Sequence, residues 1–297
     1  MQLGIRFSRK TLTGLAFLSP TFALMGLIVG LPFCFAIYLS FHSYQLNKPS
    51  VRIVSVGFQN YQRLLIDPAF WNALWNTTTL TVAAVGLQLL FGVSLALLVA
   101  TFRRGRFTEA VRTILILPMM FTPVIVAILW RMIYDASYGP LNYLLRVWWG
   151  MSRNWLGNPT TSLWAVMQTD VWQHVGFVFL ITFAGLETIP RELYEAADID
   201  GATARQVLSK ITLPLLRPYI LISLALRTVD AFRIFDKVFV LTMGGPGTSS
   251  ETLSLYAYRV AFRSYDLGYS ATISLTVALV LLIVSGLYMG LIRSGKR

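Results

Sequence analysis

Six long apolar runs alternate with short polar connections along the 297-residue chain. They cover residues 14–41, 75–101, 112–134, 162–187, 217–242 and 268–292. A bilayer core of about 30 Å needs about 20 helical residues to cross it, and each run is long enough. Because the runs are continuous, they favour helices over the alternating segments of about ten residues that build a membrane barrel. The pattern predicts an all-α membrane protein with six transmembrane helices in a single transmembrane domain, residues 1–297.

The composition agrees with a membrane protein. Hydrophobic residues make up 56% of the chain and charged residues 13%, with a mean hydropathy of +0.63, whereas soluble domains carry about 25% charged residues. A net charge of +12 would also suit a nucleic-acid-binding protein. The Lys and Arg residues, however, lie between apolar runs rather than along one solvated face. We therefore expect contact with membrane lipid and no nucleic acid. The single Cys34 and the two distant histidines predict no metal site.

Basic residues gather in alternate connections, and their distribution predicts the orientation of the chain. One side carries Arg6, Arg9, Lys10, Arg103, Arg104, Arg106, Arg112, Arg191, Arg205, Lys210, Arg217, Arg293, Lys296 and Arg297. The other side carries the shorter set Lys48, Arg52, Arg63, Arg146, Arg153, Arg259 and Arg263. Because cytoplasmic loops are enriched in Lys and Arg, both termini are expected in the cytoplasm.

A polar segment, residues 190–214, separates the fourth and fifth runs. Pro190 suits the first turn of a helix, and Gly201 suits the left-handed position at which a helix ends. Thr203 can then cap a second helix, which Pro214 and Pro218 are expected to end near the next span. The segment is predicted to form a helix-turn-helix on the cytoplasmic side.

Small residues lie among charges in this segment. A plain connector would need only a few polar residues, whereas Ala196, Ala197, Gly201 and Ala202 permit close approach by another chain. We interpret the segment as a docking surface.

The residues of this segment also resemble a known signature. Glu195-Ala196-Ala197, followed by Gly201 and then by Ile-x-Leu-Pro ending at Pro214, is similar to the EAA motif of ABC importer permeases. In that family the helix-turn-helix is the coupling element that sits in a cleft of the ATPase subunit. The resemblance implies the ABC type I importer permease fold, with the coupling segment at 190–214. It assigns ATPase docking to Glu195, Ala196, Ala197, Asp200, Gly201 and Ala202.

A second resemblance points to sugar uptake. Gly244-Gly245-Pro246, followed by Thr252-Leu253, is similar to the GGP segment of the MalF-like half of carbohydrate importers, and Phe58-Gln59-Asn60-Tyr61 is similar to their segment before the second span. The resemblance implies a sugar importer of the bacterial cytoplasmic (inner) membrane that works by alternating access. It also implies a MalG-like second permease, two copies of an ABC ATPase that uses ATP and Mg, and an extracytoplasmic solute-binding protein.

The chain itself is not expected to be an enzyme or to bind a cofactor. The nearest approach to a phosphate-binding loop is Gly290–Lys296, which is followed by Arg297 instead of Ser or Thr. ATP hydrolysis is therefore expected in a partner subunit.

Five charged residues lie inside the fifth run: Arg227, Asp230, Arg233, Asp236 and Lys237. A charge near mid-bilayer costs at least about 2.5–3.5 kcal/mol, so exposure to lipid is implausible. A spacing of three residues predicts ion pairs Arg227–Asp230 and Arg233–Asp236 on one side of a helix.

Polar residues of the fourth run complete the candidate site. Asp170, Gln173 and His174 share one helical face. Two interpretations stay open, because intramembrane charges either pair internally or mark a substrate route. For a sugar route, whose hydroxyl groups need many hydrogen-bonding partners, the candidates are Asp230, Arg233, Asp236, Asp170, Gln173 and His174.

The expected substrate is a disaccharide, an oligosaccharide or a polyol. A secondary transporter or channel is the alternative function, since these proteins also use intramembrane charge. A membrane-embedded enzyme that uses Asp170 and His174 as acid and base is a third possibility. A secondary transporter or channel would leave the segment around Glu195 unexplained.

Overall fold

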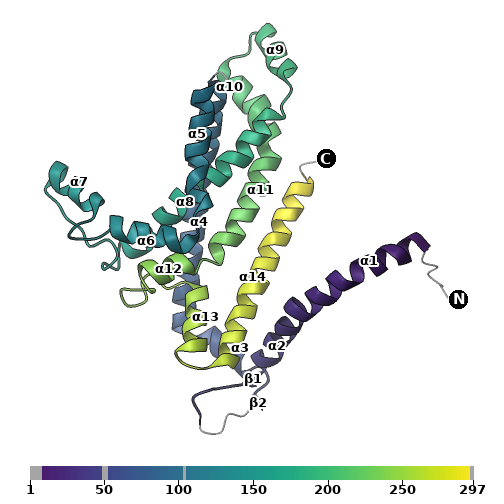
Figure 1. Cartoon of the computed structure of the whole chain (residues 1–297), viewed down its shortest axis with the longest axis vertical. Coiled ribbons are helices and arrows are strands. Elements are labelled where there is room, and N and C mark those ends of the chain that lie inside the picture. Colours follow the sequence, from purple (N-terminus) through teal and green to yellow (C-terminus); the bar gives the residue numbers. More distant parts are fainter. Residues whose placement is uncertain (1–8, 49–52, 103–104, 295–297) are drawn as a thin grey trace. The chain divides into compact units, whose positions relative to one another are not determined.

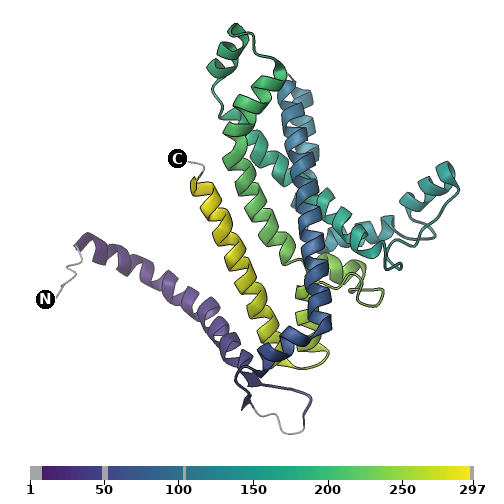
Figure 2. The same ribbon diagram turned by 180° about the vertical axis from the view of Figure 1, so that it is seen from behind.

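The computed structural model describes residues 9–48, 53–102 and 105–294. The chain forms two compact units, one of Met1–Ile66 with Ala257–Thr276 and one of Asp67–Tyr256 with Val277–Arg297. Helices dominate both units, as Figures 1 and 2 show. The all-α prediction is confirmed.

The first unit begins with a long apolar helical stretch. This stretch comprises α1 (Arg9–Met25), a π-helical turn (Gly26–Gly30) and α2 (Leu31–Ser40). A short antiparallel pair, β1 (His42–Ser43) and β2 (Val54–Ser55), precedes α3 (Gln59–Ile66). Arg63 ties α3 to the later part of the unit, because its guanidinium donates to Asp266 at 2.8 Å and lies over the ring of Tyr269.

Three long helices form the body of the second unit. They are α4 (Pro68–Thr101), α8 (Ser162–Glu187) and α11 (Leu213–Phe232), which lie side by side (Figures 1 and 2). The backbones of α4 and α8 approach closely at Gly92, where an added Cβ would lie 2.6 Å from Cβ of Val178. Ala96, Phe179 and Phe183 continue this contact as a buried apolar cluster. These three helices supply most of the polar cluster described below.

The third apolar run bends instead of forming the straight span expected over 112–134. It consists of α5 (Arg106–Ile116), a 3₁₀ turn (Leu117–Met120) and α6 (Pro123–Ile133), and the two halves differ in direction by 100°. Pro123 explains the bend, because a residue before proline avoids the helical conformation and Thr122 is extended, with ψ 146°. A further helix, α7 (Pro140–Trp149), follows α6.

The polar segment after α8 passes into α11 without a break. It comprises α9 (Arg191–Ile199), α10 (Ala204–Val207) and a π-helical turn (Leu208–Thr212). The expectation that Pro214 and Pro218 end the second helix was wrong, because α11 (Leu213–Phe232) contains both. The N–H of Leu213 bonds to the carbonyl of Leu208, five residues back, and this wider turn lets the helix continue past a proline that has no N–H to donate.

The fifth apolar run is also not a single helix. The structure ends α11 at Phe232, leaves residues 233–235 outside regular structure and begins α12 (Asp236–Leu241). The Gly245–Pro246 peptide is cis, and α13 (Leu253–Phe262) and α14 (Leu267–Ser294) complete the chain.

Within the described ranges, five helical stretches are long and apolar enough to cross a membrane. They are Phe17–Ser40, Pro68–Thr101, Ser162–Glu187, Ala204–Phe232 and Leu267–Leu291, and the bent pair supplies a sixth span when it is counted as one. This number agrees with the six predicted spans. Some basic residues used to predict the orientation lie outside the described residues: Arg6, Arg52, Arg103, Arg104, Lys296 and Arg297.

Candidate functional site

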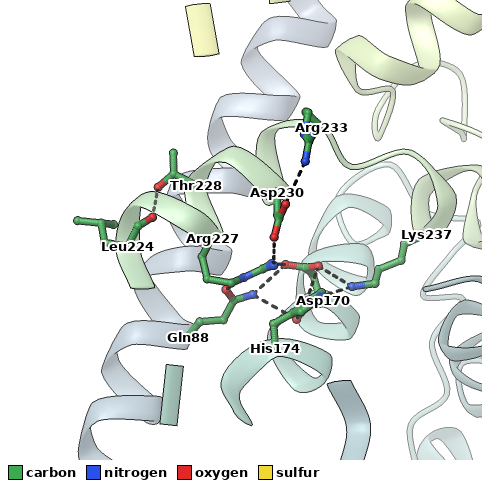
Figure 3. Close-up of polar contacts among 9 residues, drawn as sticks. All are labelled: Gln88, Asp170, His174, Leu224, Arg227, Thr228, Asp230, Arg233 and Lys237. Carbon is green, nitrogen blue, oxygen red and sulfur yellow. Dashed lines mark hydrogen bonds and ion pairs between the residues drawn. The ribbon is translucent and has the colours of Figure 1, made fainter. Parts of the chain in front are cut away.

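Asp170 on α8 is the centre of a buried polar cluster (Figure 3). Its Oδ2 accepts hydrogen bonds from Nη2 of Arg227 at 3.0 Å and Nε2 of Gln88 at 2.8 Å. Its Oδ1 accepts from Nζ of Lys237 at 2.5 Å and lies 3.1 Å from Nδ1 of His174. Asp170, Arg227, Lys237 and Gln88 are each no more than 2% exposed. Two cations therefore surround one carboxylate in a water-poor setting, where unpaired charge would be strongly unfavourable.

Four helices supply these side chains. Gln88 comes from α4, Asp170 and His174 from α8, Arg227 from α11, and Lys237 from α12. Both polar atoms of the Gln88 amide are hydrogen-bonded, because its Oε1 also accepts from Nε of Arg227 at 2.9 Å. The cluster thus hydrogen-bonds the central helices to one another, and intramembrane charges are expected to be paired in this way.

Asp230 continues the cluster toward solvent. Its carboxylate accepts from Nη1 of Arg227 at 3.4 Å and from Nη2 of Arg233 at 3.1 Å. The predicted pair Arg227–Asp230 is present, but Arg233 bonds to Asp230 rather than to Asp236. The spacing argument failed there because α11 ends at Phe232, so Arg233 and Asp236 do not share a helix.

A cavity of about 430 Å³ lies beside the cluster. Its lining residues are Pro123, Asp170, His174, Arg227, Asp230, Arg233, Ile234, Phe235, Asp236 and Lys237. Five of the six residues selected for a substrate route are therefore brought together. The sixth, Gln173, is not in the lining, and its amide donates to the carbonyl of Phe121 at 2.8 Å, before the start of α6.

The cavity wall has an accessible and a buried part. The side chains of Asp230 and Arg233 are 53% and 59% exposed, and Asp236 is also exposed. Arg227 and Lys237 were recognised in the sequence as charges but not selected for the route, although both line it. Gln88 was missed, and a lone amide within an apolar run was the only signal that could have revealed it.

The polar segment between α8 and α11 has the predicted helix-turn-helix geometry. Gly201 takes the left-handed conformation, with φ 70°. The N–H of Ala202 bonds to the carbonyl of Ala197 at 2.9 Å, which closes the end of α9. Thr203 then caps α10 through a reciprocal capping box with Gln206. The local sequence therefore fixes this turn.

The tip of the segment is open to solvent, at one end of the α4–α8–α11 bundle (Figure 1). Glu195, Ala196, Asp200 and Gly201 are exposed, Ala202 is half-buried and Ala197 is buried. Ile199, which was not selected from the sequence, has 87% of its surface exposed. A large aliphatic side chain held this far into solvent beside a small-residue turn is a candidate anchor for a partner.

A hollow of about 1070 Å³ separates the coupling segment from the ends of the spans. The Arg112–Glu187 pair, with a 3.4 Å separation, lines it on the span side, and Tyr194 and Asp198 line it on the segment side. The hydroxyl groups of Tyr194 and Thr212 lie 3.3 Å apart near the start of α11. The segment is thus held at its base while its tip stands away from the spans.

Metal chemistry finds no support in the part of the chain that the structure describes. It contains no group of three or more His, Cys, Asp and Glu side chains that could hold a metal ion.

Comparison with known proteins identifies the family. Residues 88–294 match the model of the binding-protein-dependent transport system inner membrane component. The chain belongs to this family. It is therefore a multi-pass inner-membrane permease of an ABC importer, in which ATP hydrolysis belongs to a separate subunit.

Individual relatives match this permease over nearly its whole length. A probable ABC transporter permease, y4oQ of Sinorhizobium fredii, is 38% identical over 271 residues, covering 91% of this chain and 86% of the relative. The trehalose/maltose transport system permease MalF of Thermococcus litoralis is 35% identical over 277 residues, covering 92% and 91%. The crystal structure of a bacterial alginate ABC transporter, in complex with an alginate pentasaccharide-bound periplasmic protein, contains a chain with TM-score 0.81 and 24% identity, covering 94% and 93%. The last likeness confirms the ABC importer permease fold.

Proposed function

We propose that this permease forms one half of the pore of an ATP-driven sugar importer. The relative from Thermococcus litoralis is named for trehalose and maltose transport, and the structural neighbour belongs to an alginate transporter. Within the chain, the observation that carries the proposal is the cavity of about 430 Å³ lined by carboxylates and guanidinium groups. Its volume falls within the range of about 300–1,000 Å³ that is usual for small-ligand sites.

The exposed charges of the cavity are the proposed sugar contacts. Asp230 and Asp236 accept hydrogen bonds from sugar hydroxyl groups, and Arg233 donates to hydroxyl oxygens. His174 lies deeper and has one ring nitrogen occupied by Asp170. Asp170 and Gln173 support this surface from behind, since both are buried and bonded within the chain. The substrate class is a disaccharide, an oligosaccharide or a polyol.

The coupling segment is the proposed contact with the ATPase. Glu195 and the turn at Asp200-Gly201 present charge and close backbone approach, and Ile199 adds an apolar anchor. Closure of two ATPase copies on ATP and Mg would move this segment. The helical stretch Ala204–Phe232 runs from the segment to the cavity, so the movement reaches the sugar route and alternates its access.

The partners follow from the same proposal. A MalG-like second permease supplies the other half of the pore, and a solute-binding protein delivers sugar from outside. Both termini of this permease face the cytoplasm, on the same side as the coupling segment.

The test begins with a tagged copy of the permease, purified from native membranes and examined by mass spectrometry. We expect a second permease and an ABC ATPase to copurify. The complex is then reconstituted with its binding protein, and ATP hydrolysis is measured with trehalose, maltose, alginate oligosaccharides and polyols. Stimulation by one of these sugars is the expected result. Recovery of the permease alone, moving solute without ATP, would overturn the proposal in favour of a secondary transporter.

A further inference from the structure

The cavity lies between two structural walls that meet at Asp170. One wall belongs to α8 and α11, which supply Asp170, His174, Arg227 and Asp230. The other wall consists of the start of α6, residues 233–235 and α12, which supply Pro123, Arg233 through Asp236, and Lys237. In this second wall α12 packs on α6, and Arg131 donates to the carbonyl of Val240 at 3.3 Å. These contacts hold the parts of the second wall together.

The backbone between the walls is not helical. After α11 ends at Phe232, Phe235 takes φ −130° and ψ −59°, and α12 begins at the next residue. The position of α12 relative to α11 is therefore not set by continuous helical hydrogen bonding. Thr252 donates to the carbonyl of Ile234 at 3.1 Å and holds the middle of the break. The break is consequently a fixed pivot, and side-chain contacts decide where α12 lies.

Lys237 makes the buried charged contact across the cavity, whereas the other ion pair between the two walls, Arg233 with Asp230, is more than half exposed. Its Nζ donates to Asp170 at 2.5 Å (Figure 3). Both side chains are almost fully buried. Arg227 also binds Asp170, but it lies on the same wall and keeps bonds to Gln88 and Asp230. Losing the Lys237 contact would therefore release α12 while Asp170 remained paired with Arg227.

We propose that Lys237 is a positioning residue whose ion pair with Asp170 holds the α12 wall against α8 and α11 in the resting transporter. This inference rests on the proposed sugar route. Separation of the pair widens the cavity for substrate. The pair favours two distinct states, because it is strongly attractive while both groups are buried, whereas water that reaches the separated groups hydrates both charges and weakens their attraction.

The test uses the assembled transporter with its partner permease and ATPase. Lys237→Met keeps an apolar stem of similar length but removes the charge. We expect it to raise hydrolysis of ATP in the absence of binding protein by roughly tenfold, a shift typical of coupling between sites, because the widened state is reached more easily. Lys237→Arg restores the charge and is expected to return hydrolysis to near the wild-type rate.

A distance measurement reports the position of the α12 wall relative to α8 directly. In a Cys34→Ser background, spin labels at Trp164 on α8 and at Met243, after α12, use two exposed positions. In the wild type, we expect one resting distance that lengthens when ATP, vanadate and liganded binding protein trap the complex. In Lys237→Met, the longer distance is expected at rest.

Controls separate this effect from a general loss of stability. Arg63→Met also removes an ion pair, that with Asp266 in the other compact unit, and should change neither the resting distance nor basal hydrolysis. If Lys237→Met fails to assemble, Lys237→Leu, which also removes both the charge and the hydrogen bond to Asp170, is measured in its place. The wild-type distance and rate in either assembled charge-removing variant would overturn the inference. Absence of sugar-stimulated hydrolysis in the wild type would instead overturn the proposed function, while the label distance still reports on Lys237.

Discussion

Replacement of Ile199 by Ala tests the coupling segment most directly. Ile199 is 87% exposed, so it contributes little packing within this chain, and its truncation should leave the stability of the permease nearly unchanged. If an ATPase cleft buries this side chain, the variant loses three buried carbon atoms at about 0.8 kcal/mol each, or about 2.4 kcal/mol. At about 1.4 kcal/mol per factor of ten, the affinity for the ATPase should fall by roughly 50-fold.

The assay is binding of purified ATPase to permease in lipid nanodiscs, followed by sugar uptake in reconstituted vesicles. Ile66→Ala is the matched control, because Ile66 is 80% exposed but lies at the end of α3, outside the coupling segment. We expect weaker ATPase binding and slower uptake only in Ile199→Ala. ATPase affinity equal to that of the wild type in Ile199→Ala would refute the claim that this side chain anchors the partner.

Three further predictions concern coupling, packing and sugar contact. Glu195→Lys should leave the permease folded and hydrolysis present but reduce sugar moved per ATP hydrolysed, and normal uptake would falsify the docking role of Glu195. Gly176→Ala should lower the free energy of unfolding by about 1–3 kcal/mol, because the added Cβ would overlap the carbonyl oxygen of Leu115. Gly86→Ala, where an added Cβ would meet no atom within 4 Å apart from its own helix backbone, is the paired control and should be neutral or stabilising by up to about 1 kcal/mol. Equal melting curves would contradict the close α5–α8 contact. Asp230→Asn should raise the KM for sugar uptake roughly tenfold, since hydrogen bonds to charged groups contribute about 1.5–3 kcal/mol; an unchanged KM would remove Asp230 from the sugar route.

Hydropathy located the spans well where polar connections flank an apolar run. The fourth run was expected at 162–187, and α8 occupies Ser162–Glu187. The turn between α9 and α10 was equally predictable, because Gly201 and Thr203 act through local backbone chemistry. In both places the sequence signal and the structural cause lie within a few residues of each other.

The two breaks in the spans were not predicted, for different reasons. The bend before α6 has a local cause at Pro123, but hydropathy does not register backbone direction. The break after Phe232 contains neither Gly nor Pro, so no local signal marks it. It is stabilised by a distant contact, the bond from Thr252 to the carbonyl of Ile234, and such a contact is invisible to a spacing argument.

The charged cluster shows the same division between local and distant causes. Asp170 was identifiable because a carboxylate inside an apolar run requires a partner. Its partners could not be assigned, since Gln88, Arg227 and Lys237 come from three other helices. The structure therefore joins the two sequence interpretations: Asp170 belongs to an internal ion-pair network, and that network lines a cavity with exposed charges.

The helical stretch Ala204–Phe232 links the two candidate sites mechanically. Its 29 residues span about 43 Å at 1.5 Å per residue. The stretch starts directly after the Thr203 cap and ends at the non-helical break, while Pro218 lies within it without ending it. A rotation imposed at the capped end is carried along this stretch to Phe232, where helical hydrogen bonding stops and the contact from Thr252 to Ile234 forms the pivot. In the proposed mechanism, the ion pair between Asp170 and Lys237 lies at this place because it is the contact through which that rotation displaces the cavity wall.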